Sequence, residues 1–192
     1  MKKLLLSTLI AGAIALPAFA ALDAGANAPT FTAQASLAGK EFTYSLKESL
    51  AKGPTVVYFY PSAYTQGCNA QAHAFAENMD KFVAAGASVV GVSLDSIQRL
   101  NDFSADPAYC AGKLPVASDA DGAIAKSYAI SVRDAREGAK DTRGVDIGHG
   151  FAERTTFIVS QDGKVAQVVG GQGVSPEDNV MQSLAAVQSM KK

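Results

Sequence analysis

The stretch TVVYFYPSAYTQGC, residues 55–68, decides the fold of this chain and places a single thiol within it. Thr55 to Tyr60 are bulky, β-branched or aromatic on both faces, which is typical of a central strand buried on both sides. Pro61 cannot donate to a sheet ladder, so the strand ends there. From Cys68 onward apolar residues recur at spacings of three and four, which predicts a helix with Cys68 near its N-terminus.

Strand and helix patterns alternate on both sides of this stretch. Further strands are predicted over residues 42–44, 88–94, 155–159 and 165–169. Asp162-Gly163 is a hairpin turn signal, so the last two strands are expected to pair antiparallel. Helices are predicted over residues 96–103, over residues 120–129 and from Ser175-Pro176 onward. This order predicts an α/β domain with a central mixed β-sheet flanked by helices.

The first twenty residues have the pattern of a secretory signal peptide. Lys2 and Lys3 precede an apolar run over residues 4–16, and Ala18-Phe19-Ala20 offers a small-x-small cleavage site. The run is shorter than the roughly 20 residues that span a bilayer, although an uncleaved membrane anchor is the alternative. We expect residues 1–20 to be removed and residues 21–192 to form one exported domain, in the periplasm of a bacterium with two membranes.

Composition narrows the function classes. Without residues 1–20 the chain keeps 15 basic and 18 acidic residues, with no basic stripe for nucleic acid and no second apolar run for a membrane. Its two cysteines and two histidines are not at zinc-ligand spacing, so neither a metal nor another cofactor is expected. Residues 131–150 carry eight charges without periodicity and are predicted to form a long exposed loop.

The residues around Cys68 favour nucleophilic chemistry. Free N–H groups and the dipole at a helix N-terminus stabilise an anion, and the thiolate is the reactive form of cysteine. Thr65 supplies a hydroxyl that both donates and accepts. Arg154 precedes a predicted strand, where its guanidinium could hold the charge that develops when the thiolate attacks. The alternatives are a buried structural thiol at Cys68, a helix cap at Thr65 and a surface ion pair at Arg154.

These residues resemble the signature of a known family. Pro61, Thr65 and Cys68 match the Pro-x-x-x-Thr-x-x-Cys motif of the peroxiredoxins, and Arg154 in Glu-Arg-Thr-Thr-Phe-Ile-Val is similar to their active-site arginine. Similar segments stand at residues 28–31, 91–96 and 114–119, so the resemblance covers most of residues 26–170. It is closest to the Q-type, bacterioferritin-comigratory-protein-like branch. The resemblance implies a thioredoxin-like fold and the reduction of hydrogen peroxide or organic hydroperoxides.

The resemblance also implies a role for each motif residue. Cys68 would be the peroxidatic thiolate, which becomes a sulfenic acid. Thr65 and Arg154 would orient the peroxide, Pro61 would shield the pocket, and the backbone N–H groups of Gly67 and Cys68 would donate to the substrate.

Three positions depart from the family pattern. Asn69 and Gln71 stand where the family often has Thr and Glu, and Gln66 replaces a frequent proline. Gln71 keeps a hydrogen-bonding group but lacks the charge that would help to orient the arginine.

Cys110 falls in the region where part of the Q-type branch carries a resolving cysteine. The resemblance therefore suggests that Cys110 attacks the Cys68 sulfenic acid, and that a thioredoxin-like or small-thiol reductant regenerates both thiols. Local unwinding is expected if the two Cα atoms lie more than about 7 Å apart. A permanent structural disulfide or an idle thiol is the alternative. The resemblance implies a monomer or a weak homodimer.

Two other function classes stay open at this stage. A thiol–disulfide oxidoreductase or a copper-delivery protein could share the fold, but these need two close cysteines, and residues 65–72 contain one. A non-enzymatic, disulfide-stapled binding domain would carry a Cys68 thiol of ordinary reactivity.

Overall fold

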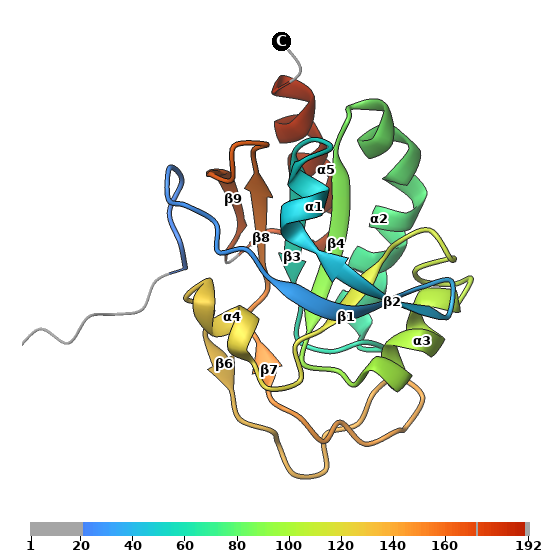
Figure 1. Ribbon diagram of the computed structural model, residues 1–192. Coiled ribbons are helices and arrows are strands. Elements are labelled where there is room, and N and C mark those ends of the chain that lie inside the picture. The colour runs from blue at the N-terminus through green and yellow to red at the C-terminus, as the bar shows by residue number, and fades with distance from the viewer. Residues whose placement is uncertain (1–20, 172, 191–192) are drawn as a thin grey trace, which may run out of the picture.

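A computed structural model describes residues 21–171 and 173–190 (Figure 1). The predicted signal peptide, residues 1–20, lies outside the described residues. The main sheet has seven strands in the order β2-β1-β5-β4-β3-β8-β9. Their bounds are Thr32–Leu37 (β1), Lys40–Ser45 (β2), Thr55–Phe59 (β3), Ser88–Ser93 (β4), Val116–Ser118 (β5), Thr155–Val159 (β8) and Val165–Gly170 (β9). A separate two-stranded sheet joins Val132–Arg133 (β6) to Phe151–Ala152 (β7).

Strand β3 lies near the middle of the sheet and is buried along its whole length, as its composition predicted. It runs parallel to β4 and antiparallel to β8, and β8 pairs antiparallel with β9. β5 continues the parallel part, while β1 is antiparallel to both β5 and β2. The mixed sheet that the sequence predicted is therefore confirmed.

Helices cover both faces of the sheet (Figure 1). They are Leu46–Leu50 (α1), Gln66–Ala84 (α2), Ile97–Ala105 (α3), Ala123–Ser127 (α4) and Pro176–Ser189 (α5). Side chains alternate along β3, so that Val56 and Tyr58 join the core beneath α2, α3 and α5. Val57 and Phe59 join the core beneath α1 and α4. Because successive side chains of β3 point to opposite faces and all of them are buried, both faces of the sheet need a covering layer of helices.

The helix that follows β3 begins two residues earlier than its apolar spacing alone indicated. Thr65 is its N-cap, and Gln66, Gly67 and Cys68 form its first turn. The last helix begins as expected, because the Ser175 hydroxyl accepts from the Asp178 N–H at 3.0 Å. The N-caps Thr65 and Ser175 therefore fix where α2 and α5 begin.

Some elements differ from the sequence-based expectation. The helix predicted over residues 120–129 is shorter, because α4 spans only Ala123–Ser127. Strand β1 and the short α1 and β5 were not predicted. β1 reads TAQASL, whose small and polar residues carry little β-strand signal. It forms because β2 and β5 pair with it on either side.

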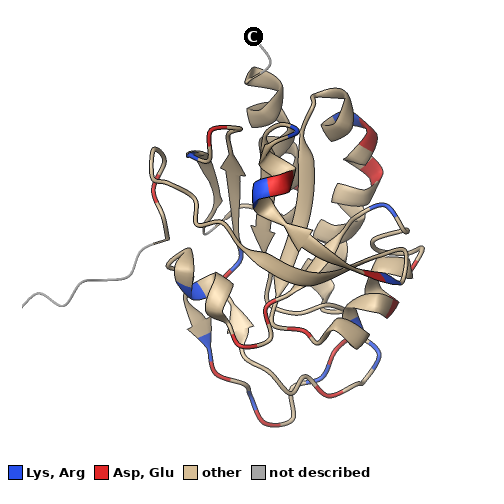
Figure 2. Ribbon diagram, in the orientation of Figure 1, with Lys and Arg blue, Asp and Glu red and all other residues tan. Residues whose placement is uncertain are grey.

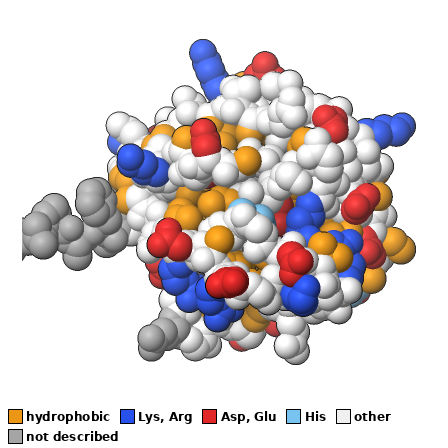
Figure 3. Space-filling model, turned by 90° about the horizontal axis from the view of Figure 1, so that it is seen from below, with side chains coloured by type: hydrophobic (Ala, Val, Ile, Leu, Met, Phe, Trp, Pro, Cys, Tyr) orange, Lys and Arg blue, Asp and Glu red, His pale blue; other side chains and the backbone are white. Residues whose placement is uncertain are grey.

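The segment over residues 131–150 is largely exposed, as predicted, but it is not loop throughout, because it contains β6 and leads from there to β7. Acidic and basic residues alternate along it. The end of the molecule that it covers carries no extended surface patch of a single charge (Figures 2 and 3). Within the described residues, no helix has the length and apolarity that a membrane span requires.

Candidate active site

Cys68 lies in the first turn of α2 with only 2% of its surface exposed. Its backbone N–H donates to the Thr65 carbonyl at 3.0 Å. In this structure the N–H thus has an acceptor in the first turn of the helix, and its donation to a substrate stays a prediction. Gly67 stands one residue closer to the helix start, where backbone N–H groups have no acceptor inside the helix.

Arg154 reaches the sulfur from the neighbouring strand. It directly precedes β8, whose first residue, Thr155, pairs with Phe59 at the end of β3. Its Nη2 donates to Cys68 Sγ at 3.2 Å, and its Nη1 donates to the Gln71 side-chain carbonyl. A Cβ on Gly67 would lie 3.2 Å from Nη2, so glycine leaves room for the guanidinium. The thiol thus faces a fixed positive charge at the start of a helix.

Thr65 and Pro61 complete the turn between β3 and α2. The Thr65 hydroxyl donates to the Ser62 carbonyl at 2.9 Å and makes no capping hydrogen bond to α2. The helix-cap alternative therefore does not describe its side chain. Pro61 and Arg154 line the same hollow of about 370 Å³. The structure brings Pro61, Thr65, Cys68 and Arg154 to one end of β3.

Tyr64 holds this turn in an unusual conformation. Its φ of 61° is rare for a bulky residue, and its ring is 2% exposed against Phe103. Its carbonyl accepts from the Thr142 N–H at 2.9 Å and from the Thr142 hydroxyl at 2.8 Å. The Arg143 guanidinium lies 3.2 Å from the centre of the ring. The exposed loop over residues 131–150 therefore braces the turn that carries Thr65.

A buried carboxylate, Asp95, ties the same turn to the rest of the fold. Asp95 is fully buried just beyond β4 and accepts from the Ala63 N–H at 2.8 Å and the Ser62 hydroxyl at 3.0 Å. Arg99 pairs with Asp95 at 2.9 Å and with Asp141 of the exposed loop at 2.8 Å. The sequence-based reasoning missed this network. One signal in the sequence could have indicated it. Asp95 follows one buried strand and Pro61 follows another, and the ends of parallel neighbouring strands lie at the same edge of a sheet.

His149 completes the network as a cation. Its Nε2 lies 2.8 Å from Asp95 Oδ1, and its Nδ1 lies 2.7 Å from the Gly150 carbonyl oxygen. Both partners are acceptors, so both ring nitrogens must carry a proton. Burial lowers the pKa of His149, but the hydrogen bond and charge of Asp95 outweigh it and raise the pKa above 6.5. His149 was expected to be only a loop residue, and His73 lies on the surface of α2 as expected.

Cys110 lies in the segment between α3 and β5, and the ring of its neighbour Tyr109 packs against the Tyr64 ring of the turn. Cys110 is fully buried, and both cysteines are free thiols. Burial raises the pKa of Cys110, with a further contribution from Asp106. Cys110 and Cys68 belong to the same hydrophobic core. In the conformation described, Cys110 is a protonated thiol that faces packed side chains.

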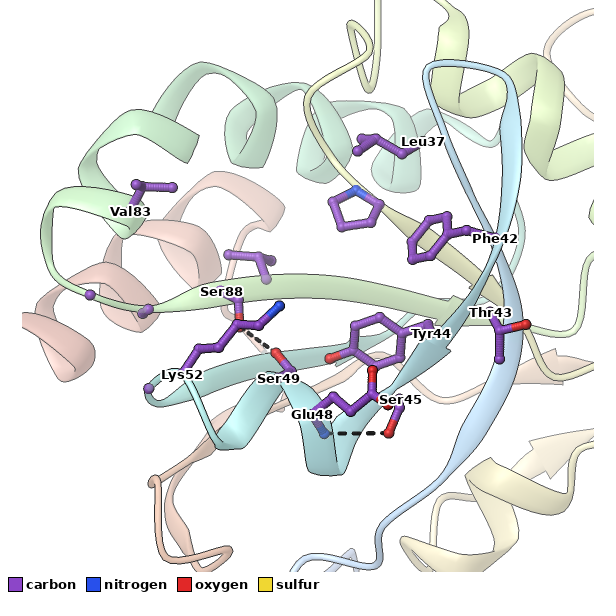
Figure 4. Close-up of a pocket in the computed structure, with 15 residues that line it drawn as sticks. Leu37, Phe42, Thr43, Tyr44, Ser45, Glu48, Ser49, Lys52, Val83 and Ser88 are labelled. Atoms are coloured by element: carbon purple, nitrogen blue, oxygen red, sulfur yellow. Dashed lines mark hydrogen bonds between the residues drawn. The ribbon is translucent and has the colours of Figure 1, made fainter.

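A second hollow lies at the opposite end of the strands. It has a volume of about 490 Å³ between β2, α1 and the start of β4 (Figure 4). Its lining includes Tyr44 and the hydroxyls of Ser49 and Ser88, which hydrogen-bond at 2.6 Å. No cysteine lines it, so it is separate from the thiol chemistry. Across residues 21–171 and 173–190, no group of three or more acidic, histidine or cysteine side chains could hold a metal ion.

A helix-start thiol facing an arginine, on a mixed sheet with helices on both faces, is the arrangement expected of a thiol-dependent oxidoreductase. The AhpC/TSA family model matches residues 24–168, and the chain belongs to that family. The chain is a peroxiredoxin, and thus a peroxidase, as the resemblance implied.

Named relatives agree with this family. The chain is 33% identical over 175 residues to peroxiredoxin Q of Sedum lineare, covering 90% of this chain and 82% of the relative. It is 31% identical over 140 residues to peroxiredoxin Bcp of Xanthomonas campestris pv. campestris, covering 73% of this chain and 79% of the relative. The likeness to the Q-type branch is thereby confirmed.

Solved structures also agree in fold. Peroxidoxin BcpB from Mycobacterium tuberculosis superposes with a TM-score of 0.71 at 25% identity, covering 88% of this chain and 98% of that one. Peroxiredoxin Q from Xanthomonas campestris gives a TM-score of 0.63 at 29% identity, with coverage of 83% and 91%. The predicted thioredoxin-like fold is confirmed.

Proposed function

We propose that Cys68 is the peroxidatic cysteine and that it reduces hydrogen peroxide and organic hydroperoxides. The thiolate attacks one peroxide oxygen, an S–O bond forms, and the O–O bond breaks. The leaving oxygen takes a proton and departs as water or an alcohol, and Cys68 becomes a sulfenic acid. The observation that carries this proposal is the 3.2 Å contact between Arg154 Nη2 and Cys68 Sγ.

The neighbouring groups support this step. Arg154 is placed to stabilise both the thiolate and the separating oxygen charge, because its guanidinium presents several N–H groups in one plane. The Thr65 hydroxyl would turn from the Ser62 carbonyl to the peroxide, and the Gly67 N–H would donate to the same substrate. Pro61 presents an apolar wall. A Xanthomonas campestris bacterioferritin comigratory protein, 29% identical, is described by its alkyl peroxide reduction activity, which favours organic hydroperoxides as substrates here.

Cys110 is proposed to resolve the sulfenic acid. Its thiol attacks the Cys68 sulfur, water leaves, and an intramolecular disulfide forms. Cys68, Cys110 and Tyr58 belong to the same hydrophobic core, so both sulfurs lie on the same side of the sheet. Residues 106–113 form turns rather than a regular element, and Ala111 has a φ of 51°. This segment is suited to open locally and release a reactive thiol.

Intact mass measurement tests the resolving step. The reduced protein, treated with one equivalent of hydrogen peroxide, is expected to lose a pair of hydrogen atoms as the disulfide forms. Cys110→Ser is expected to gain an oxygen atom instead, with the sulfenic acid trapped on Cys68.

Two results would contradict parts of this scheme. Sulfenic acid in both proteins would mean that Cys110 is a bystander and that an external thiol acts on Cys68. No rapid change in either protein would contradict the peroxidase proposal itself. Cys68→Ser is the control and should show no change in mass.

The protein is further proposed to act outside the cytosol, as a monomer or weak homodimer recycled by an exported thioredoxin-like dithiol or a small thiol. The signal-peptide pattern of residues 1–20 supports export. N-terminal sequencing of the protein recovered from producing cells is expected to begin near Ala21. A mature chain that begins at Met1 would contradict cleavage and the exported location.

A further inference from the structure

The last helix reaches the arginine site through a buried side chain. Asn179, in the first turns of α5, is 1% exposed, and Gln71 in α2 is fully buried. Gln71 Nε2 donates to Asn179 Oδ1 at 3.0 Å, while the Gln71 carbonyl accepts from Arg154. Pro176, at the start of α5, lies 3.8 Å from the position that a Gly67 Cβ would occupy. The start of α5 therefore packs beside the first turn of α2.

The hydrogen bonds of Asn179 fix which way its own amide points. Its Nδ2 donates to the Val169 carbonyl at 3.2 Å, and its Oδ1 also accepts from the Thr156 hydroxyl at 2.8 Å. A carbonyl accepts only, so the NH₂ end must face Val169 and the oxygen must face Gln71.

The same logic then fixes Gln71. Its NH₂ end must face Asn179, which leaves its oxygen directed at Arg154. If the Gln71 amide turned over, its NH₂ group would face the guanidinium, and two donors would oppose each other.

We propose that Asn179 is a positioning residue for peroxide reduction, which holds Arg154 against Cys68 by orienting the Gln71 amide. The inference rests on the proposed role of Arg154 and adds a requirement for α5. The family match ends at residue 168, before this helix begins. A glutamine at position 71 needs such a partner because an amide has one accepting end, whereas a carboxylate accepts from either oxygen.

The test is a double-mutant cycle on the full chain. Asn179→Leu is expected to lower the second-order rate constant for hydrogen peroxide by roughly ten- to a hundredfold, because a small misplacement of a catalytic group costs that much. In a Gln71→Glu background the same substitution should change the rate less than about twofold, since the carboxylate needs no orientation. A purely structural role for Asn179 would lower the rate equally in both backgrounds and would overturn the proposal.

Ser183→Ala is the matched control for the stability of α5. Ser183 is fully buried one turn further on, and its hydroxyl donates to the Asn179 backbone carbonyl at 2.7 Å without touching Gln71 or Arg154. It should lower the melting temperature but leave the rate unchanged. If Asn179→Leu does not fold, Asn179→Ser takes its place with the same expected loss of rate.

The outcomes separate this inference from the proposed function. A wild-type protein without peroxidase activity would contradict the proposed function. Loss of activity in Arg154→Met, together with wild-type activity in folded Asn179→Leu, would contradict the positioning role alone.

Discussion

Replacing Arg154 with methionine is expected to lower the second-order rate constant for hydrogen peroxide by about a hundred- to a thousandfold. Methionine keeps much of the side-chain length but removes the guanidinium, whose Nη2 donates to Cys68 Sγ at 3.2 Å. Among the described residues, no other side chain donates a hydrogen bond to this sulfur. The loss falls on the step in which negative charge moves from sulfur to the departing oxygen. Competition for peroxide between the reduced protein and a haem peroxidase of known rate measures the constant.

Two further variants show whether the effect belongs to this position. Arg154→Lys keeps the charge but cannot contact both Cys68 and Gln71 with a planar group, so it should recover only part of the rate. Arg136→Met removes a guanidinium from the exposed loop, where it packs over the Phe151 ring, and should leave the rate within about twofold of wild type. Equal losses in Arg154→Met and Arg136→Met would indicate general electrostatics and not a local contact.

The sequence predicted the centre of the fold well because its signal is local. β3 is a continuous apolar run between a glycine-proline pair and Pro61, and burial on both faces follows from that composition alone. The β8–β9 hairpin follows from its Asp-Gly turn. β1 depends on partners far along the chain, so its six residues carry no comparable signal.

The residues of the candidate site also divide into those that the sequence predicted and those that only the structure reveals. Pro61, Thr65 and Cys68 are close in sequence, and Arg154 stands at the entrance of a recognisable strand, so the sequence pointed to all four. Asp95 and Arg99 follow β4, whereas Asp141 and His149 belong to the loop over residues 131–150, and only the folded chain brings these two segments together. Asn179 could not be predicted from the sequence at all, because its proposed role depends on a hydrogen bond between α5 and α2 that forms only in the folded chain.

The network around Asp95 carries the largest expected effect on stability. Asp95→Asn is expected to lower the free energy of unfolding by about 3–5 kcal/mol, because it leaves His149 and Arg99 without their buried counter-charge. It also weakens the hold on the Ala63 N–H and the Ser62 hydroxyl, so the turn that carries Thr65 should loosen. Urea unfolding of the reduced protein at pH 6, analysed with a common slope, measures the change.

Asp119→Asn is the matched control, since Asp119 is also a buried aspartate, 3% exposed, that accepts from the Ile124 and Ala125 N–H groups without a cation. Burial raises the pKa of Asp119 more than its two backbone hydrogen bonds lower it. We expect its replacement to cost only about 1–2 kcal/mol. Equal losses in the two variants would mean that the ion pairs of Asp95 add nothing beyond hydrogen bonding.

The pH dependence of stability gives an independent test of the same network. Because the pKa of folded His149 lies above 6.5, its stabilisation is complete below that pH and is lost as the pH rises through the folded value. Burial raises the pKa of Asp95, but its hydrogen bonds, that of His149 foremost, lower it below 3.8 overall, so its stabilisation is lost only in acid. The wild-type free energy of unfolding should therefore decline above pH 6.5, and Asp95→Asn should remove this contribution to the slope. An unchanged slope in Asp95→Asn would contradict the pairing of a charged His149 with Asp95.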